Sequence, residues 1–373
     1  WVAAAVVGLL LANTAAAPAA KAVESFHFGI PALGLDLSVG HWIKDGLLAI
    51  FFFIAAIELR HELRHGELDS PRKAIVPTVA AIGGVVVPAL IFLVIVRDPE
   101  LSQGWPIPTA TDIAFALGVF AIVGKGLPPT FRALLLALAV IDDLIAILII
   151  AAFFTKDLAP IPLLIALPVV LLFGWLSYRV PKRRRAWVIP LMILLGIAAW
   201  VLVYLSGIHP TIAGVALGLI MADATAGRTR HAIEPWSNVV ILPLFAIVAA
   251  LVQIPSTNLA GLSPAFWAVI IALPFGKLVG ITGGAAIATA LARRSTGSTA
   301  HLPLPDIIAV AGLGGIGFTV SLLMNELAFE GQGSVADEVT LAVIVASVIA
   351  ALVGGVLTSL RSRHYARAAT ADR

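Results

Sequence analysis

The sequence predicts an all-α polytopic membrane protein with about twelve transmembrane helices. Of the 373 residues, 60% are hydrophobic and 12% are charged, and the mean hydropathy is +1.04. A soluble protein of this size carries roughly twice that fraction of charged residues. The apolar residues also occur in blocks of about 20, the length that crosses the hydrocarbon core of a bilayer. The composition therefore argues against a soluble protein with one large core.

Charged residues, Pro and Gly delimit the predicted spans along the chain. The first segment is as hydrophobic as a signal peptide, but it lacks a charged n-region and further spans follow it. We therefore interpret it as the first transmembrane helix. The predicted spans lie at 1–20, 43–60, 74–96, 106–124, 129–154, 160–179, 186–204, 207–222, 236–254, 264–291, 305–327 and 338–360.

The distribution of Lys and Arg orients this array. If the first span runs outward from the cytoplasm, the basic residues outside the membrane core lie on the cytoplasmic side, with four exceptions: Lys21, Lys44, Arg97 and Lys156. Cytoplasmic loops carry an excess of positive charge, so this topology is favoured and both termini are predicted to be cytoplasmic. The same asymmetry explains the net charge of +3, and no nucleic-acid partner is inferred.

Two of the predicted spans are interrupted. Pro106 and Pro108 remove backbone donors at the start of the fourth span, and the Gly-rich segment Gly312–Gly317 weakens helix in the eleventh. Unwound backbone at membrane depth occurs where it is buried in protein or lines a wet cavity. Matching interruptions in two halves of a chain indicate a transporter site. The interrupted spans are the middle members of two triplets, 74–154 and 264–360, which we predict to be inverted repeats.

Four ionisable residues lie deep in the predicted spans: Asp112, Asp142, Asp143 and Lys277. Each charge at the bilayer centre costs about 2.5–3.5 kcal/mol, so these residues are candidates for a functional site. Salt bridges that only join helices are the alternative explanation.

Asp142 and Asp143 are adjacent, and adjacent residues point about 100° apart on a helix. We expect one to face a cavity and the other to meet a neighbouring helix. Two close carboxylates repel when both are ionised, which favours retention of a proton by one of them. Such a group holds either a proton or a hard monovalent cation, and Thr111 and freed backbone carbonyls supply further oxygen ligands. Lys277 can pair with an Asp and lose its own proton when the cation arrives.

Four segments that carry these residues resemble one known family. They are Thr111–Gly118 (TDIAFALG), Ile141–Leu144 (IDDL), Phe275–Gly280 (FGKLVG) and Gly315–Ser321 (GIGFTVS). Their order and spacing are similar to those of the bacterial NhaA-type sodium/proton antiporters over essentially the whole chain.

The resemblance implies a single transporter domain, residues 1–373, in the bacterial inner membrane. Broken helices four and eleven would cross at the midplane, and the two repeats would form the ion-binding core. One Na⁺ or Li⁺ would leave the cell for about two entering protons, without a cofactor or enzyme chemistry. By motif, Asp143 is the principal ligand of the metal ion, and Asp142 and Thr111 complete the site. Lys277 pairs with Asp142, while Asp112 offsets the positive helix ends at the crossing.

Four further residues are candidates for a response to pH: Glu58, Glu62, His209 and His231. The alternative for Glu58 and Glu62 is a solvated, charged helix end, and the alternative for His209 is a satisfied packing residue. His231 matches the family, but Arg230 stands where the resemblance predicts Glu. The apolar stretch that follows Leu242–Phe245 also lacks the expected Asn-Ala-Gly. Arg230 argues against the pH activation that the resemblance implies, and the missing Asn-Ala-Gly implies an ion selectivity or a pH profile that differs from those of the best-known members.

The segment Phe26–Val39 predicts a short exposed hairpin. In the family the matching loop contributes to a homodimer, while a hairpin without a partner is the alternative. Two other functions are alternatives. One is a transporter of the same architecture for another solute, such as an organic acid. The other is an intramembrane aspartyl protease, although the signatures expected for it are not present.

Overall fold

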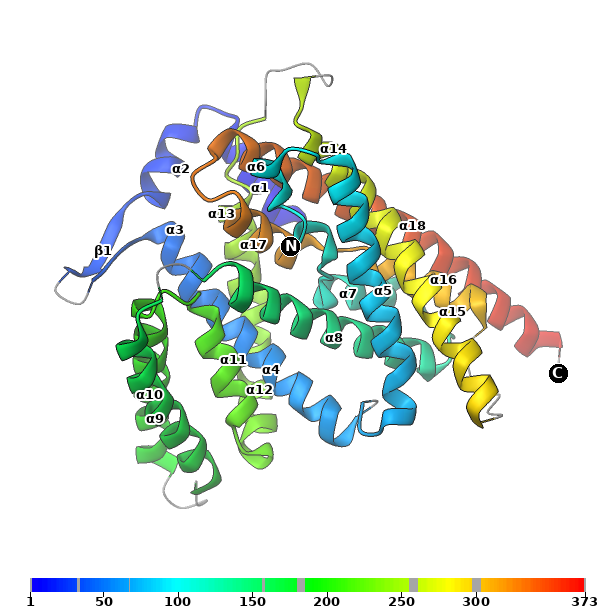
Figure 1. The fold of residues 1–373 in the computed structure, drawn as a ribbon, viewed down its shortest axis with the longest axis horizontal. Helices are drawn as coiled ribbons and strands as arrows, with labels where there is room; N and C mark the ends of the chain where they lie inside the picture. The colour runs from blue at the N-terminus through cyan, green and yellow to red at the C-terminus, as the bar shows by residue number, and fades with distance from the viewer. Residues whose placement is uncertain are drawn as a thin grey trace. The chain divides into compact units, whose positions relative to one another are not determined.

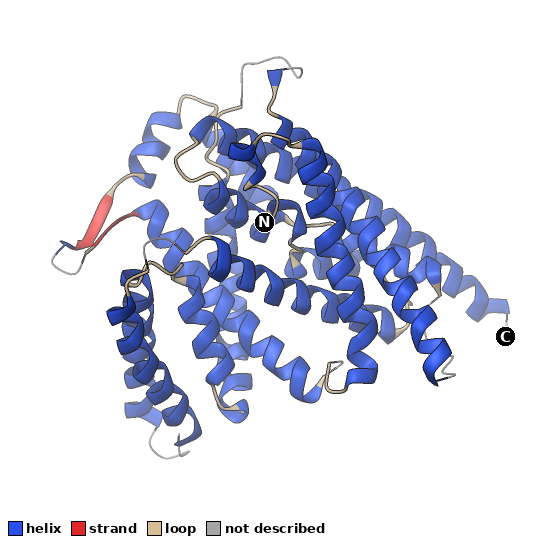
Figure 2. Cartoon of the chain, viewed as in Figure 1, coloured by secondary structure: helices blue, strands red, loops and turns tan. Residues whose placement is uncertain are grey.

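The computed structural model describes residues 2–31, 34–66, 68–155, 158–179, 185–254, 261–296 and 303–371. These residues are almost entirely helical, and one small hairpin contains their strands (Figure 2). The chain divides into two compact units, residues 1–64 with 147–251 and residues 65–146 with 252–373.

The first unit contains the hairpin and two groups of helices. Its first group is α1 (Val2–Ala12), α2 (Ala17–Glu24), β1 (His27–Ile30), β2 (Leu35–Ser38), α3 (Val39–His41), the π-helix η2 (Trp42–Leu47) and α4 (Leu48–His65). Its second group is α9 (Pro160–Arg179), α10 (Arg185–Leu205), α11 (Thr211–Ile220), α12 (Asp223–Trp236), the π-helix η4 (Ser237–Ile241) and α13 (Leu242–Ala249). Helices α9 and α10 run side by side (Figure 1).

The second unit contains both interrupted spans. Its first group is α5 (Pro71–Ile95), α6 (Pro99–Ser102), the 3₁₀ helix η3 (Ile107–Thr109), α7 (Ile113–Val123) and most of α8 (Pro129–Phe153). Its second group is α14 (Pro264–Ile271), the π-helix η6 (Ala272–Gly276), α15 (Lys277–Thr296), α16 (Leu304–Gly314), α17 (Phe318–Ala328) and α18 (Gly333–Ala371). Helix α15 packs along α5, and α16 packs along α18 (Figure 1).

The helices confirm an all-α polytopic membrane protein. Within the described ranges, seven helices are long and apolar enough to cross a membrane, and three further pairs would each form a bent span. The other two predicted spans, 43–60 and 207–222, coincide with α4, whose last turn is charged, and with the short helix α11. Each of the predicted spans thus contains helix.

The first predicted span, 1–20, is wrong in its extent. Helix α1 ends at Ala12, and α2 leaves it at an angle of 111°. At the bend, the Asn13 side chain donates to the carbonyl of Leu9 (2.8 Å). Asn competes with the helix for backbone hydrogen bonds, and Pro18 in the first turn of α2 favours a new helix start there.

Both predicted interruptions are present, and they are in contact. The fourth span bends by 43° between Pro99–Thr109 and α7, and the eleventh bends by 50° between α16 and α17. The backbone N–H of Asp112, in the first break, donates to the carbonyl of Ile316 in the second (2.6 Å). Each break therefore satisfies backbone groups that the other leaves free, as buried non-helical backbone requires.

The predicted hairpin is also present. Strands β1 and β2 pair antiparallel, with His27 opposite Ser38 and Ile30 opposite Leu35. Strand β1 is exposed, whereas Leu35 and Leu37 of β2 are buried in a cluster that includes Trp200. The hairpin is thus anchored by one strand, and its role in a homodimer stays a prediction.

Helices α5 and α15 approach closely through glycines. A Cβ atom on Gly280 would lie 2.1 Å from the carbonyl oxygen of Gly83, and one on Gly284 would lie 2.4 Å from that of Val79. Real side chains do not reach such distances, so this contact requires Gly at both positions of α15. This glycine contact therefore holds α5 and α15 together.

We predict that Gly280→Ala lowers the free energy of unfolding by about 1–3 kcal/mol, because the added methyl group forces the two backbones apart. Gly283→Ala is the matched control, since a Cβ there meets nothing within 4 Å. Melting temperatures of the purified protein in detergent measure both changes. Equal melting temperatures for the two variants would contradict the proposed contact.

Candidate functional site

The four ionisable residues predicted within the spans are all buried in the second unit. Asp112 is the last residue of the break in the fourth span, Asp142 and Asp143 lie in α8, and Lys277 is the first residue of α15. Their exposed fractions are 3%, 2%, 6% and 0%. Charged groups this deeply buried need partners within the protein.

Lys277 and Asp142 form a buried ion pair, with the ammonium in direct contact with Asp142 Oδ2. Lys277 Nζ also donates to the Thr111 hydroxyl at 2.7 Å. Thr111 Oγ1 lies 2.6 Å from Asp142 Oδ2 and 2.7 Å from the carbonyl oxygen of Gly314. Its single hydrogen can serve either acceptor. Thr111 therefore joins the lysine, the carboxylate and the last residue of α16.

The local backbone explains the position of Lys277. It follows the π-helical segment η6, which contains Pro274. Proline has no backbone N–H, and single π-turns inside longer helices are frequent at functional sites. The wider turn ends at Lys277, whose side chain reaches the break in the fourth span.

Asp142 and Asp143 have different surroundings, as their adjacent positions on a helix predict. Asp142 Oδ2 contacts Lys277 and Thr111, whereas Asp142 Oδ1 accepts no hydrogen bond from the described part of the chain. Asp143 is also buried, and its carboxylate lies within electrostatic reach of Lys277. One ammonium group thus acts on two carboxylates, and an Asp142 oxygen has capacity for a further ligand.

Asp112 binds the N-terminal ends of two helices. Its Oδ1 accepts from the backbone N–H of Phe115 in the first turn of α7 (2.9 Å). Its Oδ2 accepts from the backbone N–H (3.2 Å) and the hydroxyl (2.7 Å) of Thr319 in the first turn of α17. A carboxylate is stabilised at such helix ends because their free N–H groups carry partial positive charge. Asp112 therefore ties the two breaks together.

Sequence reasoning missed Thr319 as a member of this site. It lies in the segment Gly315–Ser321, but an isolated hydroxyl in an apolar span gave no sign of its partner. The available signal was its place in the first turn of the helix that follows the Gly-rich break, where backbone N–H groups need an acceptor from outside the helix.

The candidate pH-response residues lie in the first unit. Glu58 pairs with Arg230 (3.2 Å), and Arg230 also pairs with Glu234 (3.3 Å). Glu62 is buried, at 7% exposure. The burial of Glu62 contradicts a solvated position for that acid, whereas Glu58 is partly exposed and forms its ion pair with Arg230. Arg230, which departs from the expected Glu, supplies the cation for Glu58.

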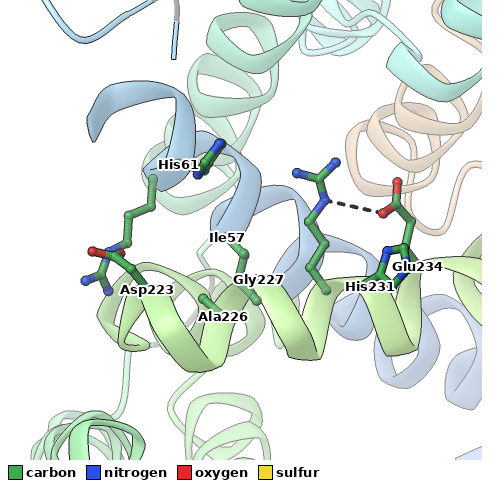
Figure 3. A pocket seen from close by; sticks show the side chains of 9 residues that line it. Ile57, His61, Asp223, Ala226, Gly227, His231 and Glu234 are labelled. Carbon is green, nitrogen blue, oxygen red and sulfur yellow. Dashed lines mark hydrogen bonds and ion pairs between the residues drawn. The ribbon is translucent and has the colours of Figure 1, made fainter. Parts of the chain in front are cut away.

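His209 and His231 differ in their contacts. His209 Nδ1 lies 2.7 Å from the Thr211 hydroxyl, and its Nε2 lies 3.5 Å from Asp45. His231 lines a pocket of about 230 Å³ between α4 and α12. Figure 3 shows His231 and Glu234 on one helix of this pocket and His61 on the other. His209 thus contacts Thr211 and Asp45, whereas His231 lines the pocket together with Arg230 and Glu234.

Comparison with known proteins agrees with the motifs. A family model described as Na⁺/H⁺ antiporter 1 matches residues 1–358. The chain belongs to this family. It is 53% identical over 371 residues to a protein named Na⁺/H⁺ antiporter NhaA 2 from Clavibacter michiganensis, covering 99% of this chain and 90% of that protein. It is 45% identical to Na⁺/H⁺ antiporter NhaA from Streptomyces avermitilis, covering 97% and 79% of the two chains.

Membership in the Na⁺/H⁺ antiporter 1 family confirms the resemblance that the motifs predict. The family is one of transporters and not of enzymes, so the alternative of an intramembrane protease has no support. The arrangement of the acids agrees with this result. Asp142 is paired with Lys277 and Asp112 caps two helices, whereas a protease needs two acids that face one scissile bond.

We predict that Lys277→Met and Asp142→Asn are strongly coupled in stability. Each single substitution removes one partner of a buried ion pair and should cost about 3–5 kcal/mol, because the other partner stays buried without compensation. The double variant has no such charge and should cost less than the sum. A double-mutant cycle of unfolding free energies in detergent measures the coupling. Additive costs would show that the two groups are not a pair.

Proposed function

We propose that this protein expels Na⁺ or Li⁺ in exchange for protons at a site formed by Asp143, Asp142 and Thr111. The observation that carries the proposal is the buried contact of the Lys277 ammonium with Asp142 and Thr111. The Lys277 ammonium group carries an exchangeable proton, and it already contacts carboxylate and hydroxyl oxygen atoms. Oxygen atoms of this kind bind hard metal ions. Membership in the Na⁺/H⁺ antiporter 1 family supports the same substrates.

Competition for these oxygens couples the two fluxes. An arriving Na⁺ takes the carboxylate oxygens, Lys277 loses its partner, and its ammonium releases a proton to water. Asp143, which is the principal ligand in this proposal, releases its own proton when the metal ion binds. Among the described residues, no group of three or more His or acidic side chains could hold a metal ion. Thr111 and backbone oxygens such as that of Gly314 would therefore complete the shell.

Asp112 contributes to cation binding through its negative charge and is not a direct ligand of the metal ion in this proposal. Its carboxylate accepts hydrogen bonds from the starts of α7 and α17. It thereby offsets the positive ends of two helices beside the place where a cation must bind. Without this acid, the helix ends would repel Na⁺.

The exchange of one Na⁺ for about two protons moves net charge across the membrane. The two protons in this proposal come from Asp143 and Lys277. Transport should therefore be electrogenic, since each elementary charge gains about 2.3 kcal/mol per 100 mV of potential.

The cytoplasmic end of the first unit is the proposed region of pH response. Glu58, Glu62 and His231 lie at or near the pocket between α4 and α12, and His209 lies in a separate contact with Asp45. A change of charge on His231 would alter the electrostatics of the pocket that it lines. Arg230 already neutralises Glu58, so the response should differ from that of a relative with Glu at this position.

We further propose a location and an assembly for this protein. It would lie in the bacterial inner membrane with both termini in the cytoplasm, in contact with lipid and without a cofactor. The hairpin β1–β2 would contribute to a homodimer, because its outer strand is exposed.

We predict that Asp143→Asn abolishes Na⁺- and Li⁺-dependent proton release in everted vesicles, because a neutral amide cannot exchange a proton for a metal ion. Asp36→Asn, a change of the same chemistry on the exposed hairpin, is the matched control. Dissipation of ΔpH by Na⁺, Li⁺ and K⁺ over a pH series gives the readout, with equal insertion of both variants verified. Wild-type exchange by Asp143→Asn would refute the site assignment.

We further predict that the initial rate of exchange in proteoliposomes depends on membrane potential. The potential can be set with valinomycin and K⁺ gradients at constant ΔpH. A potential that is negative on the side where Na⁺ is bound should accelerate Na⁺ expulsion, because net positive charge moves toward that side. A rate that is indifferent to potential would indicate equal numbers of Na⁺ ions and protons.

A further inference from the structure

Helix α18 carries four residues at intervals of seven positions: Thr340, Ser347, Gly354 and Arg361. We call them the α18 stripe. Residues seven apart lie on nearly the same face of a helix, with a drift of about 20° per interval. At 1.5 Å per residue the stripe extends about 32 Å, close to the thickness of the hydrocarbon core of a bilayer.

Every residue of the α18 stripe contacts the interrupted eleventh span. Near the end of α17, the Asn325 side-chain amide donates to the hydroxyl of Thr340 (2.9 Å). At the start of α17, the backbone N–H of Phe318 donates to the hydroxyl of Ser347 (3.1 Å). Both stripe hydroxyls are buried, so each hydrogen bond satisfies a group that water does not reach.

The other two contacts hold α16. A Cβ atom on Gly354 would lie 2.6 Å from the backbone carbon of Gly312, so the helices touch through their backbones. Arg361 Nε lies 2.6 Å from Asp306 in the first turn of α16, and the Tyr365 hydroxyl donates to the same carboxylate (2.7 Å). Asp306 is fully buried, which makes this pair more than a surface contact. One face of α18 therefore holds both halves of the broken span.

Ser347 is the member of the stripe that is linked to Asp112 through the start of α17. Its partner Phe318 is the first residue of α17, and the next residue is Thr319, which donates twice to Asp112. The backbone N–H of Phe318 belongs to the first turn of α17, where N–H groups have no partner within the helix. The Ser347 hydroxyl supplies the acceptor from a neighbouring helix and thereby fixes the position from which Thr319 reaches Asp112.

We propose that the α18 stripe positions the break in the eleventh span for ion exchange, and that Ser347 is the positioning residue through which α18 holds Thr319 and Asp112 in place. This inference rests on the proposed Na⁺/H⁺ exchange. Ser347 binds no ion in this scheme. It acts through the backbone of α17, so its loss weakens the binding of Na⁺ and leaves the exchanging carboxylates intact.

The test compares Ser347→Ala, Ser347→Thr and Thr358→Val with the wild type in proteoliposomes. Ser347→Ala removes the acceptor for Phe318, and Ser347→Thr keeps a hydroxyl at the same position. Thr358→Val is the matched control, because Thr358 is a buried residue of the same helix whose hydroxyl has no hydrogen-bond partner within the described residues. Initial rates over a range of Na⁺ concentrations separate the half-saturating concentration from the maximal rate.

We expect Ser347→Ala to raise the half-saturating Na⁺ concentration about fivefold, which is about 1 kcal/mol at 1.4 kcal/mol per tenfold change. The maximal rate and the melting temperature should stay close to those of Thr358→Val, and Ser347→Thr should restore the wild-type value. Amide hydrogen exchange of peptides that cover Phe318 and Thr319 should be faster in Ser347→Ala alone.

Three results would overturn the positioning role. The first is an unchanged half-saturating Na⁺ concentration in Ser347→Ala. The second is a failure of Ser347→Thr to restore the wild-type half-saturating concentration. The third is a loss of exchange rate that is explained by a lower melting temperature alone. The exchange rate of the wild type distinguishes failure of the positioning role from failure of the proposed Na⁺/H⁺ exchange. If the wild type shows no Na⁺-dependent exchange, both proposals are refuted; if it exchanges normally and Ser347→Ala matches it, only the positioning role is refuted.

Discussion

The burial of the Lys277–Asp142 ion pair is the interaction on which the rest of the second unit depends. Removing two charges from water costs several kcal/mol per ion, and their attraction offsets this cost only with good geometry and further hydrogen bonds. Thr111 supplies such a hydrogen bond, and it lies in the break of the fourth span. An uninterrupted helix could not place both its hydroxyl and the freed carbonyl of Gly314 at this point. The two breaks are therefore a structural requirement of the buried pair.

The breaks in turn create helix ends that need partners. The starts of α7 and α17 present free N–H groups, and Asp112 accepts hydrogen bonds from both. The same acid joins the breaks through its backbone N–H, which donates to Ile316. Helix α18 completes the arrangement, because its Ser347 accepts from Phe318 and its Arg361 pairs with Asp306. The hydrogen-bonding groups of Asp112, Thr319, Phe318 and Ser347 are thus satisfied by one another. Asp142 Oδ1 accepts no hydrogen bond from the described residues and has capacity for a ligand.

Much of the fold could be predicted from the sequence, because the solvent of a membrane protein constrains its composition. Apolar blocks gave the spans, and Pro106, Pro108 and the glycines of Gly312–Gly317 gave the breaks. Charges in apolar spans gave Asp112, Asp142, Asp143 and Lys277, which the structure brings into one unit. The bend after Ala12 was not predicted, because one Asn and one Pro compete only weakly with a long apolar pattern.

The partners of individual residues could not be predicted, because they depend on contacts between helices far apart in sequence. The pair of Glu58 with Arg230 and the contact of His209 with Asp45 are of this kind. Thr319 and Ser347 are buried hydroxyls whose importance follows only from the backbone N–H groups and carboxylate beside them. Asp306 lies at the edge of a predicted span, where an acid is expected to be solvated, yet α18 buries it completely.

Competition between metal ion and protons for the same buried oxygens is the central claim. Isothermal titration of the purified protein with Na⁺, repeated in buffers of different ionisation enthalpy, counts the protons released per ion bound. Competition predicts a heat of binding that changes with the buffer and corresponds to release of about two protons, one each from Asp143 and Lys277. A heat that is the same in every buffer would mean that Na⁺ binds without displacing protons, and would contradict the claim.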